Sequence, residues 1–192
     1  MKQWAYIKEL VLAVMEKDPA ATSFMATLLY SPGIRALAAH RKAHGLWQKG
    51  KKLRALRIAY KARRRTGIEI HPGATLGRRI VIDHGMGVVI GETAILGDDV
   101  LLFHGVTLGG LSSQKGAKRH PTVGSHVLLG AGSTILGNIT IGDGAKVGAH
   151  ALVLHNVPSG ATAVGCTGRT IAREEKDWRA ENEIALAQRA SA

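Results

Sequence analysis

Cysteine and long apolar runs are the two features that this sequence most clearly lacks. Its 192 residues include one cysteine, Cys166, which excludes an internal disulfide and fits a reducing compartment. No stretch of about 18 apolar residues occurs, and no charged-then-apolar leader opens the chain. The sequence therefore predicts neither a membrane span nor a signal peptide, and we expect a cytoplasmic protein with no membrane partner.

Acidic residues are scarce in the first third of the chain. Residues 1–66 hold 15 Lys/Arg but only 3 Asp/Glu, whereas residues 67–192 hold 11 of each, so the formal charge of +12 is entirely N-terminal. The basic run 61–65 could meet phosphates, but no recognised nucleic-acid motif accompanies it. We expect a solvated helix face that also attracts anionic ligands, and no nucleic-acid partner.

A six-residue repeat dominates the rest of the sequence, in which an aliphatic residue is closely followed by glycine and small or polar residues. Three such hexads make one triangular coil of a parallel β-helix, with each aliphatic side chain pointing inward. An ordinary strand sandwich would not keep a register of six over so many units. Counting in sixes gives these inward positions: Ile70, Leu76, Ile82, Val88, Ala94, Val100, Val106, Val123, Leu129, Ile135, Ile141, Val147 and Val153.

The repeat is interrupted once, because Val106 and Val123 are seventeen residues apart instead of six or twelve. The intervening segment, residues 107–121, is polar and basic, which predicts a loop that leaves the coil and carries function. Apolar spacing predicts helices over about 3–16, 20–30 and, in one or two pieces, 34–65, and a terminal helix over 171–190.

These patterns predict an α+β chain in three parts. The expected boundaries are 1–66 for a helical segment, 67–168 for the β-helix with its protruding loop, and 169–192 for a C-terminal helix and tail.

Titratable residues gather where the repeat begins, at Glu69, His71, Asp83 and His84. A neutral imidazole near a carboxylate can take a proton from a hydroxyl, so general-base catalysis is one interpretation. A solvated turn histidine explains the spacing equally simply. A zinc site is a further alternative, although no close histidine pair with familiar metal-motif spacing is present. Its candidate ligands are His71, His84, His104, His120 and His126.

Four phrases of the sequence carry more specific information: EIHPGATLG (69–77), IDHGMGVVIGET (82–93), VTLGG (106–110) and KRHP (118–121). Together they closely resemble the bacterial serine acetyltransferases, and similar stretches extend the resemblance over about residues 17–165. The hexads alone would indicate only the wider hexapeptide-repeat acyltransferase superfamily.

The resemblance implies a left-handed β-helix that transfers acetyl from acetyl-CoA to the serine hydroxyl, the first step of cysteine biosynthesis from serine. His84 would be the general base that deprotonates serine. Glu69 would orient it, standing where the family has aspartate, and its extra methylene requires a slightly different approach. Acetyl-CoA would be a cosubstrate, and no metal or permanently bound cofactor is implied.

The resemblance also implies how the substrates are held. Asp18 and Asp83 would face the serine ammonium, while Arg119 and His120 from the loop would hold its carboxylate. Glu92 matches a family position near the catalytic histidine. The acetyl-CoA groove between subunits would be lined by Gly110, Ala131, Lys146 and Ala149.

The family is expected to assemble as a homotrimer with shared active sites. A dimer of trimers is in doubt, because only about 66 residues precede the repeat. L-Cysteine would inhibit by occupying the serine site. The family's tail often ends in an isoleucine that enters O-acetylserine sulfhydrylase, whereas this chain ends in Ala-Ser-Ala, so that complex is not expected. The alternatives are an acetyltransferase for homoserine or a sugar hydroxyl, and a non-enzymatic or metal-binding β-helix.

Overall fold

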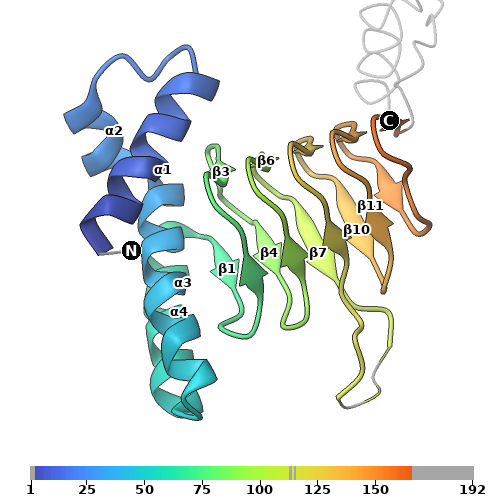
Figure 1. Ribbon diagram of the computed structural model, residues 1–192, viewed down its shortest axis with the longest axis horizontal. Helices are drawn as coiled ribbons and strands as arrows, with labels where there is room; N and C mark the ends of the chain where they lie inside the picture. Colours follow the sequence, from blue (N-terminus) through green and yellow to red (C-terminus); the bar gives the residue numbers. More distant parts are fainter. Residues whose placement is uncertain (1–2, 113, 115, 166–192) are drawn as a thin grey trace, which may run out of the picture.

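Helices stand at one end of a stack of short strands in the computed structural model, which describes residues 3–112, 114 and 116–165 (Figure 1). The described helices are α1 (Gln3–Lys17), α2 (Phe24–Tyr30), α3 (Pro32–Gln48) and α4 (Lys52–Thr66). Cys166 and the expected C-terminal helix lie outside the described residues.

The helices expected before residue 66 are confirmed, apart from one boundary. Helix α2 begins at Phe24 and not near residue 20, because the Ser23 side chain caps it by accepting a backbone N–H three residues on, at 3.4 Å. The residues before Ser23 form a turn. Helices α3 and α4 are separate, and the link between them contains Gly50 at φ +72°.

The described strands are each two or three residues long. They are β1 (Glu69–Ile70), β2 (Thr75–Leu76), β3 (Val81–Ile82), β4 (Val89–Ile90), β5 (Ile95–Leu96), β6 (Leu101–Leu102), β7 (Thr107–Gly109), β8 (Thr122–Val123), β9 (Leu128–Leu129), β10 (Thr134–Leu136), β11 (Thr140–Ile141), β12 (Lys146–Val147), β13 (Leu152–Val153) and β14 (Thr162–Ala163).

Three parallel sheets form the three faces of the coil. One face has the order β1-β4-β7-β10-β13, the second β2-β5-β8-β11 and the third β3-β6-β9-β12-β14. With the exception of the β12–β14 pair, each strand pairs with the third strand along the chain, as a three-sided coil requires. The predicted parallel β-helix is therefore confirmed, and Figure 1 shows its coils stacked away from the helices.

Aliphatic side chains fill the interior of the coil. All the inward positions counted in sixes are buried except Leu76, which is only half-buried. Most turns also bury a second residue, two positions before the inward residue of the following strand. These second positions include Ile68, Ala74, Ile80, Val88, Ala94, Val100, Val106, Val127, Ser133, Ala145 and Ala151.

The count in sixes does not follow the same structural position throughout. Within the first coil it moves from the inward residue of a strand to the buried residue two positions before the inward residue. Ile70 pairs with Ile90, twenty residues on, whereas Ile90 pairs with Leu108, eighteen residues on. The first coil therefore carries two extra residues, in the turn between β3 and β4 that contains His84. Val88 is consequently not equivalent to Ile82, and the strict register of six predicted from the sequence is wrong at this turn.

A second insertion lies in the third coil. Thr107 pairs with Thr134, twenty-seven residues on, which is nine more than a regular coil. The sequence places the start of this loop at Thr107, which is wrong, because residues 107–109 form β7 and the excursion begins at Gly110. Figure 1 shows the segment between β7 and β8 leaving the body of the coil.

Helix α3 packs closely against the first coil. A Cβ on Gly33 would lie 2.4 Å from the Ile82 carbonyl oxygen, so only glycine allows this approach of helix and strand. Farther along α3, the buried His40 ring bonds to the Ala74 carbonyl at 3.2 Å, and His44 bonds to the Pro72 carbonyl at 2.8 Å. Two imidazoles thus tie one helix face to the turn that follows β1.

The stability of the protein is expected to fall between neutral and mildly acid pH because of His40. Burial, with the nearby charge of His44, lowers the pKa of His40 to about 4, so the folded chain binds this proton less readily than the unfolded chain. Its contribution is complete above about pH 6.5 and is lost toward about pH 4, at up to about 1.4 kcal/mol per pH unit.

Urea unfolding at several pH values measures this effect. The variant His40→Gln keeps a donor for the Ala74 carbonyl but cannot titrate, so subtracting its curve isolates His40 from the other histidines. Parallel pH dependences for the two proteins would contradict the assignment.

Candidate active site

His84 stands in the lengthened turn of the first coil with its ring in solvent. Its φ of +57° is unusual for a residue with a side chain. Its side chain is 73% exposed, and its Nε2 lies 3.7 Å from the Asp83 Oδ2. The His104 ring from the next coil meets it edge-on, with the ring centroids 5.9 Å apart. The two extra residues therefore present an accessible imidazole beside a carboxylate.

A cleft of about 310 Å³ opens between this turn and the helices. Asp18, just past the end of α1, lines it together with Asp83 and His84, as do Ser23 before α2 and Tyr30 at the end of α2. The Asp18 carboxylate also accepts a backbone N–H in its own turn, at 2.8 Å. The turn role of Asp18 and a role in the cleft are thus compatible, since a carboxylate has several lone pairs.

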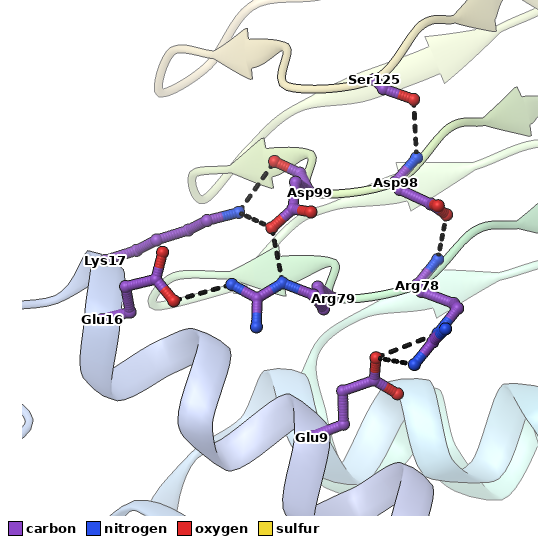
Figure 2. A network of polar contacts seen from close by, with 8 residues as sticks. All are labelled: Glu9, Glu16, Lys17, Arg78, Arg79, Asp98, Asp99 and Ser125. Atoms are coloured by element: carbon purple, nitrogen blue, oxygen red, sulfur yellow. Dashed lines mark hydrogen bonds and ion pairs between the residues drawn. The ribbon is translucent and has the colours of Figure 1, made fainter.

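Figure 2 shows the polar network that fixes the end of α1, and with it Asp18, against the coil. The Lys17 ammonium lies 3.4 Å from Asp99 Oδ1 and donates to the Asp99 carbonyl at 2.8 Å. Arg79 joins Asp99 to Glu16 through bonds of 2.8 and 2.7 Å. Partial burial acts to raise the Asp99 pKa, but the Arg79 hydrogen bond and the two cations outweigh it and hold the pKa below its usual range.

Glu69 does not contact His84 within the described chain. Its carboxylate pairs instead with Arg63 of α4 at 3.1 Å, and both side chains are about half in solvent. Exposed ion pairs of this kind contribute little free energy, so the bond to Arg63 is easily exchanged for another. The role of Glu69 beside His84 stays a prediction.

Arg119, at the end of the loop, lies against the turn that follows β4. Its guanidinium is 3.4 Å from the Glu92 carboxylate. The neighbouring His120 ring is buried, and its Nδ1 faces Thr93. Burial and the Arg119 charge lower the pKa of His120, so that its neutral form is favoured. His71 lies close by, and burial likewise lowers its pKa.

These groups divide between two corners of the coil. The turn with His84 joins the faces of β3 and β4, whereas Glu92 lies between β4 and β5, with Arg119 just before β8. Neither Arg119 nor His120 is among the residues that line the His84 cleft. One chain therefore separates the predicted ammonium-binding carboxylates from the predicted carboxylate-binding residues of the loop.

The residues expected to line an acetyl-CoA groove are also spread over several faces. Ala131 and Ala149 lie in stacked turns, joined by a bond from the His150 N–H to the Ala131 carbonyl at 2.8 Å. Lys146 is exposed on the neighbouring face and lines a hollow of about 500 Å³ with Asp99. Gly110 lies apart from these three, under Arg119.

The described part of the chain bears on the zinc site and on the membrane span. Over those residues, no cluster of three or more His, Cys, Asp or Glu is arranged to hold a metal ion. Within the same ranges, no helix has the length and apolar character needed to cross a bilayer.

The basic run of α4 lies on an exposed helix face. Its Arg63 pairs with Glu69, and its Lys61 and Arg65 line a cleft of about 710 Å³ together with Arg35 and Lys42 of α3.

Several residues of the site were not found from the sequence. Thr93 holds the loop end, while Arg79 and Asp99 fix the end of α1. Arg79 and Asp99 both have a positive φ, +55° and +58°, but this feature is seen only in a structure. The sequence therefore carried no signal for either residue. A threonine in a hexad turn resembles many others in the sequence.

Comparison with known proteins defines the class. The family model described as "Bacterial transferase hexapeptide (six repeats)" matches residues 120–155. The serine acetyltransferase of Mycobacterium tuberculosis is 48% identical over 175 residues, which are 88% of this chain and 76% of that protein. The fold, the repeat and this relative define a hexapeptide-repeat transferase.

Solved structures agree with this class. Isoform 3 of the Entamoeba histolytica serine acetyltransferase, in complex with cysteine, has a TM-score of 0.85 and 37% identity, covering 94% of this chain and 65% of that one. The Brucella abortus serine acetyltransferase, in complex with coenzyme A, has a TM-score of 0.82 and 39% identity, covering 89% and 68%. The chain belongs to the serine acetyltransferase family.

Proposed function

We propose that this protein transfers the acetyl group of acetyl-CoA to the hydroxyl of L-serine, giving O-acetyl-L-serine and CoA, the first step of cysteine biosynthesis from serine. The observation that carries the proposal is the exposed His84 imidazole, which shares a cleft with Asp83 and Asp18. Membership of the serine acetyltransferase family supports the same reaction.

In the proposed reaction His84 takes the proton from the serine Oγ as that oxygen attacks the thioester carbonyl. The C–S bond of the tetrahedral intermediate then breaks, and the departing CoA sulfur receives the proton from His84. Asp18 and Asp83 hold the serine ammonium, which places its hydroxyl at the imidazole. Once the Glu69 carboxylate has left its ion pair with Arg63, it orients the His84 ring and stabilises the imidazolium.

The complete site requires a second copy of the chain. Two oppositely charged half-sites lie at different corners, so we propose that the His84 corner of one subunit faces the Arg119 corner of its neighbour. Three flat-sided coils packed around an axis give three such sites, which supports a homotrimer of left-handed β-helices. Acetyl-CoA would lie along the same subunit boundary, against Ala131, Ala149, Lys146 and the neighbour's Gly110.

Some finer expectations accompany this proposal. We also propose the division into residues 1–66, 67–168 and 169–192, and a cytoplasmic location.

Substitution of the base tests the reaction. His84→Ala is expected to lower serine-dependent release of CoA from acetyl-CoA by about 10²–10⁴-fold, because the proton acceptor is lost. The rate of CoA release is compared with serine, homoserine, a galactoside or no acceptor present. Glu69→Gln, which keeps the shape but removes the charge, should lower kcat by a smaller factor. Equal rates for wild type and His84→Ala would exclude His84 as the base. Faster CoA release with homoserine or with the galactoside than with serine would show that serine is not the preferred acceptor.

Mixed trimers test whether sites are shared. His84→Ala and Arg119→Ala subunits are each expected to be inactive alone, but co-expression should restore about a quarter of the wild-type rate, because each site then has about one chance in two of receiving each intact half. The control mixes His84→Ala with His84→Gln, which places no intact His84 in any site. No recovery in the first mixture would contradict a site built from two subunits.

L-Cysteine should compete with serine, since it carries the same ammonium and carboxylate and replaces only the hydroxyl. The relative from Entamoeba histolytica has been solved with cysteine. Initial rates at subsaturating serine should fall at millimolar cysteine and recover as serine is raised. An unchanged rate, or inhibition that serine does not relieve, would contradict a common site.

A further inference from the structure

The hydroxyl and the backbone N–H of Thr93 both hold the end of the loop. Its Oγ1 accepts the backbone N–H of Arg119 at 3.0 Å and that of His120 at 3.1 Å. A hydroxyl oxygen offers two lone pairs and one proton, so both lone pairs are occupied. The same Oγ1 lies 2.8 Å from the His120 Nδ1, and its proton must therefore point toward that nitrogen.

The His120 ring is consequently fixed in one chemical form. Its Nδ1 faces the Thr93 hydroxyl and also the Thr93 backbone N–H, at 3.2 Å. Two donors directed at one nitrogen require that this nitrogen carry no proton. The neutral ring then bears its proton on Nε2, where it can only donate a hydrogen bond. A donor is what a carboxylate ligand needs.

Space for the ring is provided by Gly91. A Cβ at this position would lie 2.0 Å from His120 Cδ2, closer than any non-bonded contact allows. The charged groups that surround His120 are Arg119 and Lys118 of the loop, with Glu92 and His71 on the neighbouring turns. The Lys118 ammonium adds a bond to the His120 carbonyl, so the loop end is also held on its far side.

We propose that Thr93 is a positioning residue for the carboxylate of the amino-acid substrate, because it fixes the backbone at Arg119 and His120 and holds His120 as the Nε2–H tautomer. The inference rests on the proposed serine site. Thr93 itself touches no substrate. It fixes the backbone position from which the Arg119 side chain extends, and it determines which nitrogen of the His120 ring can donate a hydrogen bond. Glu92, 3.4 Å from Arg119, then limits the rotation of that guanidinium until a substrate carboxylate arrives.

Thr93→Val tests this role with a side chain of nearly the same shape. Removal of the hydroxyl should raise the KM for serine at least tenfold while kcat changes much less, since a carboxylate contact is kept throughout the reaction. The KM for acetyl-CoA should not change. Thr93→Ser restores the hydroxyl and should restore the serine KM. Thr75→Val, at an exposed threonine whose hydroxyl makes no hydrogen bond among the described residues, is the matched control.

A second readout reports the tautomer without any substrate. In protein with ¹⁵N-labelled histidine, the His120 signals, assigned with His120→Ala, should show the Nε2–H tautomer in wild type and Thr93→Ser. In Thr93→Val this signature should be lost. If Thr93→Val does not fold, Gly91→Ala displaces the ring instead and should give the same rise in serine KM.

Each outcome is decisive. An unchanged serine KM in Thr93→Val, or an unchanged tautomer, would overturn the positioning role. If wild type itself shows no serine-dependent release of CoA, the proposed function fails, whereas the tautomer comparison still decides whether Thr93 controls His120.

Discussion

The whole structure depends on backbone hydrogen bonds between successive coils, which keep one aliphatic layer above the next. Each strand is only two or three residues long, so no strand is stable by itself and every one relies on its neighbours above and below. The pairing fixes a repeat of eighteen residues per coil, seen between Ile90 and Leu108. Every departure from that number therefore has to be accommodated at a corner, outside the packed interior.

The groups that we propose for catalysis and substrate binding lie at these departures. Two extra residues lift His84 into solvent in a left-handed backbone conformation, and nine extra residues bring Arg119 and His120 back onto the turn that follows β4. The helices add the remaining carboxylate, because the Lys17–Asp99–Arg79 cluster holds the end of α1 beside the first coil (Figure 2). A rigid solenoid thus supplies fixed positions, while irregular segments supply the reactive groups.

Much of this architecture could be predicted from the sequence, since a period of six leaves few alternatives to a three-sided coil. The two extra residues in the turn that contains His84 could not be predicted. The coil buries aliphatic residues at two positions, so Val88 continues the count in sixes as well as Ile90 does. The clustering of titratable residues points to His84 and Asp83, the resemblance to a family adds Asp18 and the expected roles, and the structure brings all three to one cleft. The support given by Thr93 depends on atoms twenty-six or more residues apart, which no local pattern reveals.

The nine-residue insertion has a consequence for how such a protein can change. Strand pairing returns to eighteen residues immediately after it, from Thr134 to Leu152, so the insertion disturbs nothing beyond its own coil. A mutation that lengthens, shortens or recharges this segment leaves the interior layers intact. Under the roles that we propose for Arg119 and His120, acceptor preference can therefore evolve separately from foldability, because the sequence of the coil need not change with that of the loop.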